Sequence, residues 1–329
     1  MDEERLSVLW KLADDLRRQC VGDEVHLRGL LEISNHCVRR CAYCGINAGN
    51  SSLPRYRMNG GEILECARQA KSLGCGTVVL QAGEDYGLSR RLVAEAVRSI
   101  KDETGLAVTL SLGERPEADL AEWKLAGADR YLLRFETSDG ALYRRIHPAV
   151  SEDEPDRIVL LGTLRELGYE TGSGIMVGLP GQSYESIAAD IALFRKLDLD
   201  MIGIGPFILH PATALGKESG GADQAPPTEL MALKAVALAR LVCPHANIPA
   251  TTALSTMNRS AWYEAALRRG ANVVMPDITP ERYRSLYEIY PGKASSGEHG
   301  IADPASIRLR IEAMGRPIAA GPGARRRES

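Results

Sequence analysis

Three cysteines within eight residues give this sequence its clearest chemical signal. They are Cys37, Cys41 and Cys44, in the spacing CxxxCxxC, and Tyr43 directly precedes the last of them. Three thiolates can bind three irons of a cubane 4Fe-4S cluster, for which four protein thiolates would be the full complement. The next cysteine, Cys66, is distant in the sequence, so one iron would stay open. An open iron can bind the amino and carboxylate groups of S-adenosylmethionine (SAM), whose sulfonium can accept an electron.

That electron transfer would yield a 5′-deoxyadenosyl radical, and the spacing with Tyr43 in place is similar to the signature of the radical SAM enzymes. A structural zinc site is one alternative, but it usually pairs CxxC with a second CxxC or HxxxH, and only His36 lies nearby. A disulfide framework is another, and it needs an oxidising compartment and usually a short chain. We therefore predict a cluster bound by the three motif cysteines, which with Tyr43 form the catalytic centre.

The composition bounds the partners and the compartment. A formal net charge of −3 over 329 residues gives no electrostatic basis for binding nucleic acid or a membrane surface. The first 20 residues are charged and amphipathic, unlike a signal peptide, and no stretch approaches the ~20 apolar residues of a membrane helix. Seven cysteines, an odd number, indicate a reducing cytoplasm. We interpret the remaining four as core residues without a part in the cluster: Cys20, Cys66, Cys75 and Cys243.

Short apolar runs alternate with helical patterns along the chain, as in βα units around a parallel sheet. Eight runs predict strands: Val25–Ile33, Thr77–Gln81, Ala107–Ser111, Arg130–Arg134, Thr171–Val177, Met201–Ile204, Asn247–Ala250 and Asn272–Met275. Other stretches have apolar residues spaced by three and four, which predicts helices. These are Gly61–Leu73, Arg90–Glu103, Ala118–Leu125, Pro155–Leu167, Ser183–Leu197 and Thr228–Leu241.

Eight such units predict an α/β fold, a complete (β/α)8 barrel of the TIM type, with function at the C-terminal ends of the strands. A doubly wound open sheet is the competing architecture. We expect one radical SAM barrel domain over residues 1–315, with a helical lead-in over residues 1–24. The last residues, 316–329, are predicted to form a flexible tail.

Polar or loop-forming residues follow the predicted strands, where they would gather at the barrel mouth that holds the cysteine loop. They are Ser34, Asn35, Gln81, Glu84, Ser111, Arg134, Glu136, Pro180, Pro206, Thr251, Thr252 and Asp277. SAM carries both signs of charge, so its site needs both. The turn that ends in Glu84 can offer carbonyls and a carboxylate to the ammonium. Arg134 and Glu136 can clamp ribose hydroxyls or pair with each other, and Arg157 is either a fork for the SAM carboxylate or an exposed helix residue.

Nine segments between about Val25 and Lys293 together resemble HydE, the family of radical SAM maturases of FeFe-hydrogenases. They are CVRRCAYCGI, RYRM, VVLQAGED, VTLSLGE, ADRYLLRFET, ELGYETGSGIMVGLPGQ, IGIGPFILHPATAL, NIPATTAL and ANVVMPDITPERYRSLYEIYPGK. Several are weak alone, but in this order they distinguish the chain from the related biotin synthase and methylornithine synthase branches. The resemblance implies a full barrel with the cluster and SAM at its top and a largely closed internal cavity.

The resemblance also implies roles for individual residues. The cluster would be bound by Cys37, Cys41 and Cys44. The SAM pocket would be lined by Tyr43, Gly83, Glu84, Arg134, Glu136, Arg157 and Met201. The substrate cavity would be lined by Gln81, Thr109, Ser111, Arg130, Thr251, Thr252, Met275, Tyr287 and Tyr290. Ala82 stands where the family can have serine, which puts that contact with substrate in question.

Family members act on an iron–carbonyl–cyanide species that carries cysteine and is delivered by a partner maturase. The resemblance therefore implies an organometallic or other small-molecule substrate, other hydrogenase maturases as partners, and a role in building the diiron subcluster of the hydrogenase. Arginine and hydroxyl groups in the proposed cavity suit an anionic metal complex or an amino-acid carboxylate.

One departure from the family pattern concerns the cluster count. Some members carry three further cysteines shortly after the YPGK segment, but here residues 294–300 hold none, and none follows Cys243. We therefore predict a single cluster. Three functions stay open at this point: a hydrogenase maturase, a radical SAM enzyme of the same branch acting on a small amino acid or thiol metabolite, and a non-catalytic iron–sulfur carrier.

Overall fold

The computed structural model describes residues 2–151, 156–217, 224–258, 262–293 and 304–325, and within them eight parallel strands form one sheet in the order β6-β5-β4-β3-β2-β1-β8-β7. The sheet closes where Met201 pairs with Asn247: the amide of Ile202 donates to the Asn247 carbonyl at 3.0 Å. This closure confirms the predicted (β/α)8 barrel and excludes the open doubly wound sheet.

Each of the eight predicted strands is present, with some shifts at the ends. They are β1 (His26–Ser34), β2 (Thr77–Ala82), β3 (Ala107–Ser111), β4 (Arg130–Leu132), β5 (Glu170–Val177), β6 (Met201–Pro206), β7 (Pro249–Ala250) and β8 (Val273–Val274). The last two are only two residues long.

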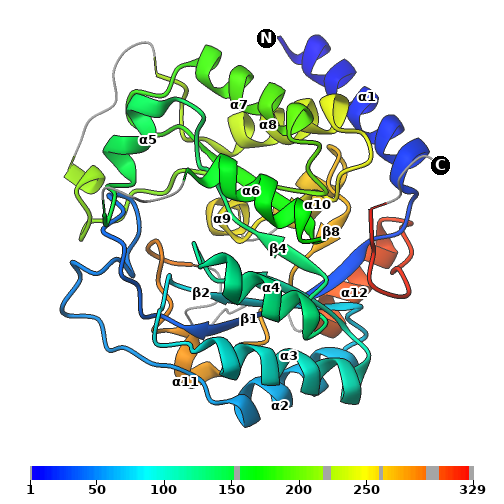
Figure 1. Cartoon of the computed structure of the whole chain (residues 1–329). Coiled ribbons are helices and arrows are strands. Elements are labelled where there is room, and N and C mark those ends of the chain that lie inside the picture. Colours follow the sequence, from blue (N-terminus) through cyan, green and yellow to red (C-terminus); the bar gives the residue numbers. More distant parts are fainter. Residues whose placement is uncertain (1, 152–155, 218–223, 259–261, 294–303, 326–329) are drawn as a thin grey trace.

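Helices surround the strands (Figure 1). The six predicted ones are α2 (Gly60–Ser72), α3 (Arg90–Thr104), α4 (Glu117–Leu125), α6 (Arg157–Glu166), α7 (Tyr184–Lys196) and α8 (Glu229–Val242), and the lead-in forms α1 (Glu3–Val21). Sequence periodicity missed α5 (Gly140–Ile146), α9 (Thr252–Met257), α10 (Trp262–Leu267) and α11 (Glu281–Arg284). Each spans seven residues or fewer, too short for a repeat of three and four to show. A final helix, α12 (Pro304–Ala313), precedes the C-terminal segment. No described helix is long and apolar enough to span a membrane.

Alternation along β1 explains how the barrel makes both a core and a cavity. Leu31 and Ile33 point outward to the helices and are fully buried in the main hydrophobic core. Arg28, Leu30 and Glu32, at the intervening positions, line an internal cavity. Successive side chains of a strand point to opposite faces, so a single strand supplies both surfaces.

The segment 316–325 differs from the flexible tail that we predict. Val25 and Ile318 form a parallel bridge, and the Ala319 amide donates to the Val25 carbonyl at 3.0 Å. The segment therefore pairs with the chain just ahead of β1, at the N-terminal end of the barrel. Its sequence is rich in alanine, proline and glycine and shows no strand pattern. Its hydrogen bonds are made by backbone carbonyls and by the side chains of Arg316 and Arg325.

Candidate active site

The cysteine loop leaves β1 and is fixed at its start by Asn35. The side-chain Nδ2 of Asn35 donates to the carbonyls of Pro54 and Leu286, both at 2.8 Å, so it ties the loop to two distant segments. The loop then passes very close to the turn after β2. A Cβ placed on Gly83 would lie 2.2 Å from the His36 carbonyl oxygen, so only glycine permits this approach.

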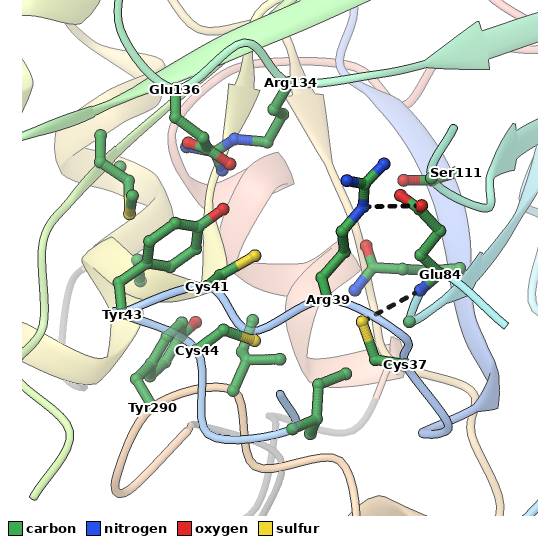
Figure 2. Close-up of a pocket in the computed structure, with 18 of the residues that line it drawn as sticks. Cys37, Arg39, Cys41, Tyr43, Cys44, Glu84, Ser111, Arg134, Glu136 and Tyr290 are labelled. Atoms are coloured by element: carbon green, nitrogen blue, oxygen red, sulfur yellow. Dashed lines mark hydrogen bonds and ion pairs between the residues drawn. The ribbon is translucent and has the colours of Figure 1, made fainter. Parts of the chain in front are cut away.

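The sulfur atoms of Cys37, Cys41 and Cys44 surround one open space, with Tyr43 on one side and Glu84 on the other (Figure 2). The Glu84 amide donates to the Cys37 sulfur at 3.4 Å, the kind of backbone hydrogen bond that stabilises a thiolate ligand. All seven cysteines are free thiols, so no disulfide framework forms.

This donor set fits a cluster. Burial raises the pKa of all three motif thiols, that of Cys41 to about 12, so these thiols would stay protonated without a compensating cation. Iron supplies that charge, since a coordinating thiol loses its proton. Among the described residues, no three side chains of His, Cys, Asp or Glu are grouped closely enough to hold a single metal ion. In a cubane each thiolate binds its own iron, so three separated sulfur atoms match a cluster better than zinc.

A buried network of alternating charges supports the loop from below. Arg39, inside the cysteine motif, donates to Glu84 at 2.7 Å and to Glu114 at 2.6 Å. Arg157 at the start of α6 donates to Glu114 at 2.7 Å and lies 3.9 Å from Glu84. All four residues are buried. Burial opposes ionisation of Glu114, but His147 and the two arginines outweigh it and hold the pKa of Glu114 at about 2.

His147 connects this network to the cluster loop. Its Nδ1 lies 3.1 Å from the sulfur of Cys41, and its Nε2 lies 3.6 Å from Glu114. Burial lowers the pKa of His147 to about 4, so the ring is neutral at physiological pH. A neutral ring carries one N–H, so it donates either to the Cys41 sulfur or to Glu114.

The SAM residues implied by the resemblance gather around one cavity of about 250 Å³, with one exception. Its lining includes the three cysteines together with Tyr43, Gly83, Glu84, Arg134, Glu136 and Arg157. Arg134 and Glu136 form an ion pair of 3.0 Å at the end of β4. Glu136 has a φ of +62°, which is rare for a residue other than glycine, and Gly174 holds it there by accepting from its amide at 3.0 Å.

A second cavity of about 150 Å³ lies deeper in the barrel and adjoins the first, because both are lined by Gln81, Ser111 and Tyr290. Most residues implied for substrate line one cavity or both: Gln81, Thr109, Ser111, Thr251, Thr252, Met275, Tyr287 and Tyr290. The hydroxyls of Thr252 and Tyr290 lie 2.8 Å apart. The Thr109 hydroxyl is buried without a hydrogen-bond partner among the described residues.

Two residues are not where the resemblance places them. Arg130 is not among the residues that line either cavity: it pairs with Glu170 at 2.5 Å and donates to Thr77 at 3.1 Å. It begins β4, at the end of the strand remote from the mouth. Met201 begins β6 and lines the deeper cavity instead of the SAM pocket. Its sulfur accepts a hydrogen bond from Arg28 at 3.1 Å.

Sequence reasoning missed several buried ionisable residues at the site: Arg28, Glu32, Arg39, Glu114, His147 and Lys293. Arg39 had a signal, since it stands between two motif cysteines. Glu32 and Lys293 form a buried ion pair on the cavity wall, with Asp277 3.9 Å from Lys293. Burial raises the pKa of Glu32 to about 8. These two residues are 261 positions apart, and no local pattern joins them.

Residues 31–194 match the radical SAM superfamily. The chain is 47% identical to the [FeFe] hydrogenase maturase subunit HydE of Thermotoga maritima, over 97% of this chain and 89% of that protein. It is 30% identical to the 3-methylornithine synthase of Methanosarcina acetivorans, over 95% and 85% of the two chains. A crystal structure of methylornithine synthase superposes with a TM-score of 0.85 at 27% identity, covering 97% of this chain and 90% of that one.

The barrel, the cysteine loop and the family match together define the class: this chain is a radical SAM enzyme. Within that superfamily it belongs to the HydE family.

Proposed function

We propose that this enzyme cleaves SAM reductively and uses the 5′-deoxyadenosyl radical in assembly of the diiron subcluster of an FeFe-hydrogenase. The observation that carries this proposal is 47% identity to a hydrogenase maturase subunit across nearly the whole chain. The site supports it, because the cysteine loop opens onto a deeper polar cavity in the barrel.

Cys37, Cys41 and Cys44 would bind one 4Fe-4S cluster, since no cysteine is available for a second motif after Cys243. When bound and reduced, the cluster supplies the electron that breaks a carbon–sulfur bond of SAM. Two charged groups would orient SAM: the Glu84 carboxylate toward its ammonium, and the Arg157 guanidinium toward its carboxylate.

The remaining lining residues would hold the rest of SAM: Tyr43, Gly83, Arg134 and Glu136. Glu136 is the one suited to the ribose hydroxyls, because its carboxylate lines the cavity and can accept hydrogen bonds from them. The fixed φ of Glu136 keeps that carboxylate in place before SAM arrives.

The substrate in this proposal is a cysteine-bound iron–carbonyl–cyanide species in the deeper cavity. Hydroxyl donors line that cavity, including Thr109, which has no hydrogen-bond partner in the described part of the chain. Arg134 lies at the junction with the SAM pocket. Such donors suit an anionic complex. The junction allows a radical formed beside SAM to reach a substrate without crossing solvent.

The wider setting follows from the same proposal. One sheet contains all eight strands, which supports a single barrel domain over residues 1–315. Seven free thiols support a reducing cytoplasm as the compartment. Other hydrogenase maturases would be the partners, delivering the precursor or receiving the product.

Reconstituted maturation tests this function. An apo-hydrogenase lacking its diiron subcluster would be incubated anaerobically with the other maturases, SAM, a reductant and this protein, and hydrogen evolution measured. We expect activity that depends on this protein and is absent with Cys44→Ala. If the protein carries its cluster and cleaves SAM but the hydrogenase stays inactive, the maturase role is contradicted and the radical SAM chemistry is not.

The likeness to methylornithine synthase favours one second candidate, an enzyme that rearranges a small amino acid. It predicts SAM-dependent conversion of an amino acid into an isomer of unchanged mass, measurable by chromatography and mass spectrometry. The maturase proposal predicts no such isomer.

A further inference from the structure

The C-terminal segment crosses the end of the barrel opposite the cysteine loop. The Pro322 carbonyl accepts from the Thr77 hydroxyl at 3.0 Å and from Arg130 Nη2 at 3.2 Å. Thr77 begins β2 and Arg130 begins β4, so one carbonyl joins the N-terminal ends of two strands. This contact explains why Arg130 faces away from the mouth.

The next carbonyl joins two more elements. That of Gly323 accepts from Arg28 Nη2 at 3.2 Å and from the side-chain Nδ2 of Asn247 at 3.0 Å. Arg325 then anchors the segment beside β6 through ion pairs with Asp198 at 2.6 Å and Asp200 at 3.3 Å. The segment therefore spans the barrel end from β1 to β6.

Arg28 links this segment to the substrate cavity. It is only 4% exposed and lines the deeper cavity, four residues and about 13 Å along β1 below Glu32. Nη1 donates to the Met201 sulfur and Nη2 to Gly323, while Nε is buried without a hydrogen-bond partner among the described residues. Burial and the neighbouring Arg130 lower the pKa of Arg28 to about 9. A buried guanidinium without a carboxylate partner is costly unless an anion joins it.

We propose that residues 319–325 are a positioning element of the substrate cavity, whose Gly323 carbonyl orients the Arg28 guanidinium toward an anionic group of the substrate. This inference rests on the proposed function, since it takes the deeper cavity as the substrate site. The segment lines neither cavity and acts through Arg28, so it is not catalytic.

Gly76 offers a way to displace the segment without shortening the chain. A Cβ on Gly76 would lie 1.7 Å from the Gly321 carbonyl oxygen, so Gly76→Ala must push the segment outward. Truncation after Ala320 removes the same contacts but keeps the pairing of Ala319 with Val25. Gly162→Ala in α6 is the matched control, because no atom lies within 4 Å of its added Cβ.

The test measures two affinities of the cluster-loaded enzyme by titration under anaerobic conditions. One ligand is SAM, and the other is a synthetic iron complex that carries cysteine, carbon monoxide and cyanide, added in the presence of SAM. We expect Gly76→Ala and the truncated protein to bind SAM as wild type does and the iron complex at least tenfold more weakly. Gly162→Ala should match wild type for both ligands.

A double-mutant cycle decides whether the segment acts through Arg28. Arg28→Gln should weaken binding of the iron complex, and truncation should then add little to that loss. Additive losses, an unchanged affinity after displacement, or a parallel loss of SAM binding would each overturn the proposal. If the wild type does not bind the iron complex, the proposed function is overturned, and this inference with it. That outcome is distinguishable from failure of the inference alone, because it is seen before any substitution is made.

Discussion

Replacement of Glu114 by glutamine should reveal how strongly the charge network beneath the cluster loop stabilises the fold. Glu114 accepts from Arg39 at 2.6 Å and from Arg157 at 2.7 Å, and it is 4% exposed. Glutamine keeps the shape and removes the negative charge. Arg39 retains Glu84 as a partner, whereas Arg157 loses its closest one.

The pKa of Glu114 gives the size of the effect. It falls from the ordinary value of 4.5 to about 2 in the folded protein, despite burial, because His147 and the two arginines favour the charged form. A difference of this size corresponds to about 3 kcal/mol of stability, at about 1.36 kcal/mol per pKa unit. Because the folded pKa is the lower one, this contribution is complete above about pH 4.5 and is lost as the pH falls toward 2.

Urea unfolding of the apo-protein, under reducing conditions, measures the change in the free energy of unfolding. We expect Glu114→Gln to be less stable than wild type by about 3 kcal/mol at pH 7, and by less than half of that near pH 3. Glu117→Gln, an exposed carboxylate on α4, is the control and should change little. Equal stability of wild type and Glu114→Gln at pH 7, or a difference that does not shrink in acid, would refute the electrostatic reasoning.

Three further outcomes follow from the site. Alanine at any one of the motif cysteines should abolish cluster binding, measured as bound iron. Cys66→Ala is the control and should keep full iron content. Full iron in Cys44→Ala would be incompatible with our ligand assignment. Gly83→Ala should displace the cysteine loop and reduce cluster retention, because its Cβ would lie 2.2 Å from a carbonyl oxygen, while Gly60→Ala meets no atom within 4 Å and should retain the cluster. His147→Phe should lower the cluster's midpoint potential by about 40 mV, the equivalent of losing one hydrogen bond of about 1 kcal/mol to the Cys41 sulfur. An electrochemical titration measures this potential, and an unchanged value would count against that hydrogen bond.

The sequence predicts the barrel well because its signals are local. Each strand is a short apolar run, and the longer helices repeat apolar residues at three and four. The cysteine spacing and the charges after strand ends are local too, so Cys37, Glu84 and Glu136 could be placed at the mouth. Their convergence on one cavity follows from the topology of parallel strands.

What the sequence does not show depends on contacts between distant segments. Arg130 has the residue type of an anion ligand, yet it starts its strand and faces the barrel end that Pro322 covers. Glu32 and Lys293 meet across 261 positions. The segment 316–325 lacks any strand pattern, and it is held to distant parts of the chain by backbone carbonyls and by the side chains of Arg316 and Arg325.

Electron paramagnetic resonance of the reduced, reconstituted protein, recorded with and without SAM under strict anaerobiosis, tests the central claim most directly. Our account predicts a 4Fe-4S signal that shifts when SAM is added, because one iron has no protein ligand and SAM binds there. A 4Fe-4S signal that SAM leaves unchanged would contradict the open iron and the radical mechanism, and would favour an iron–sulfur carrier.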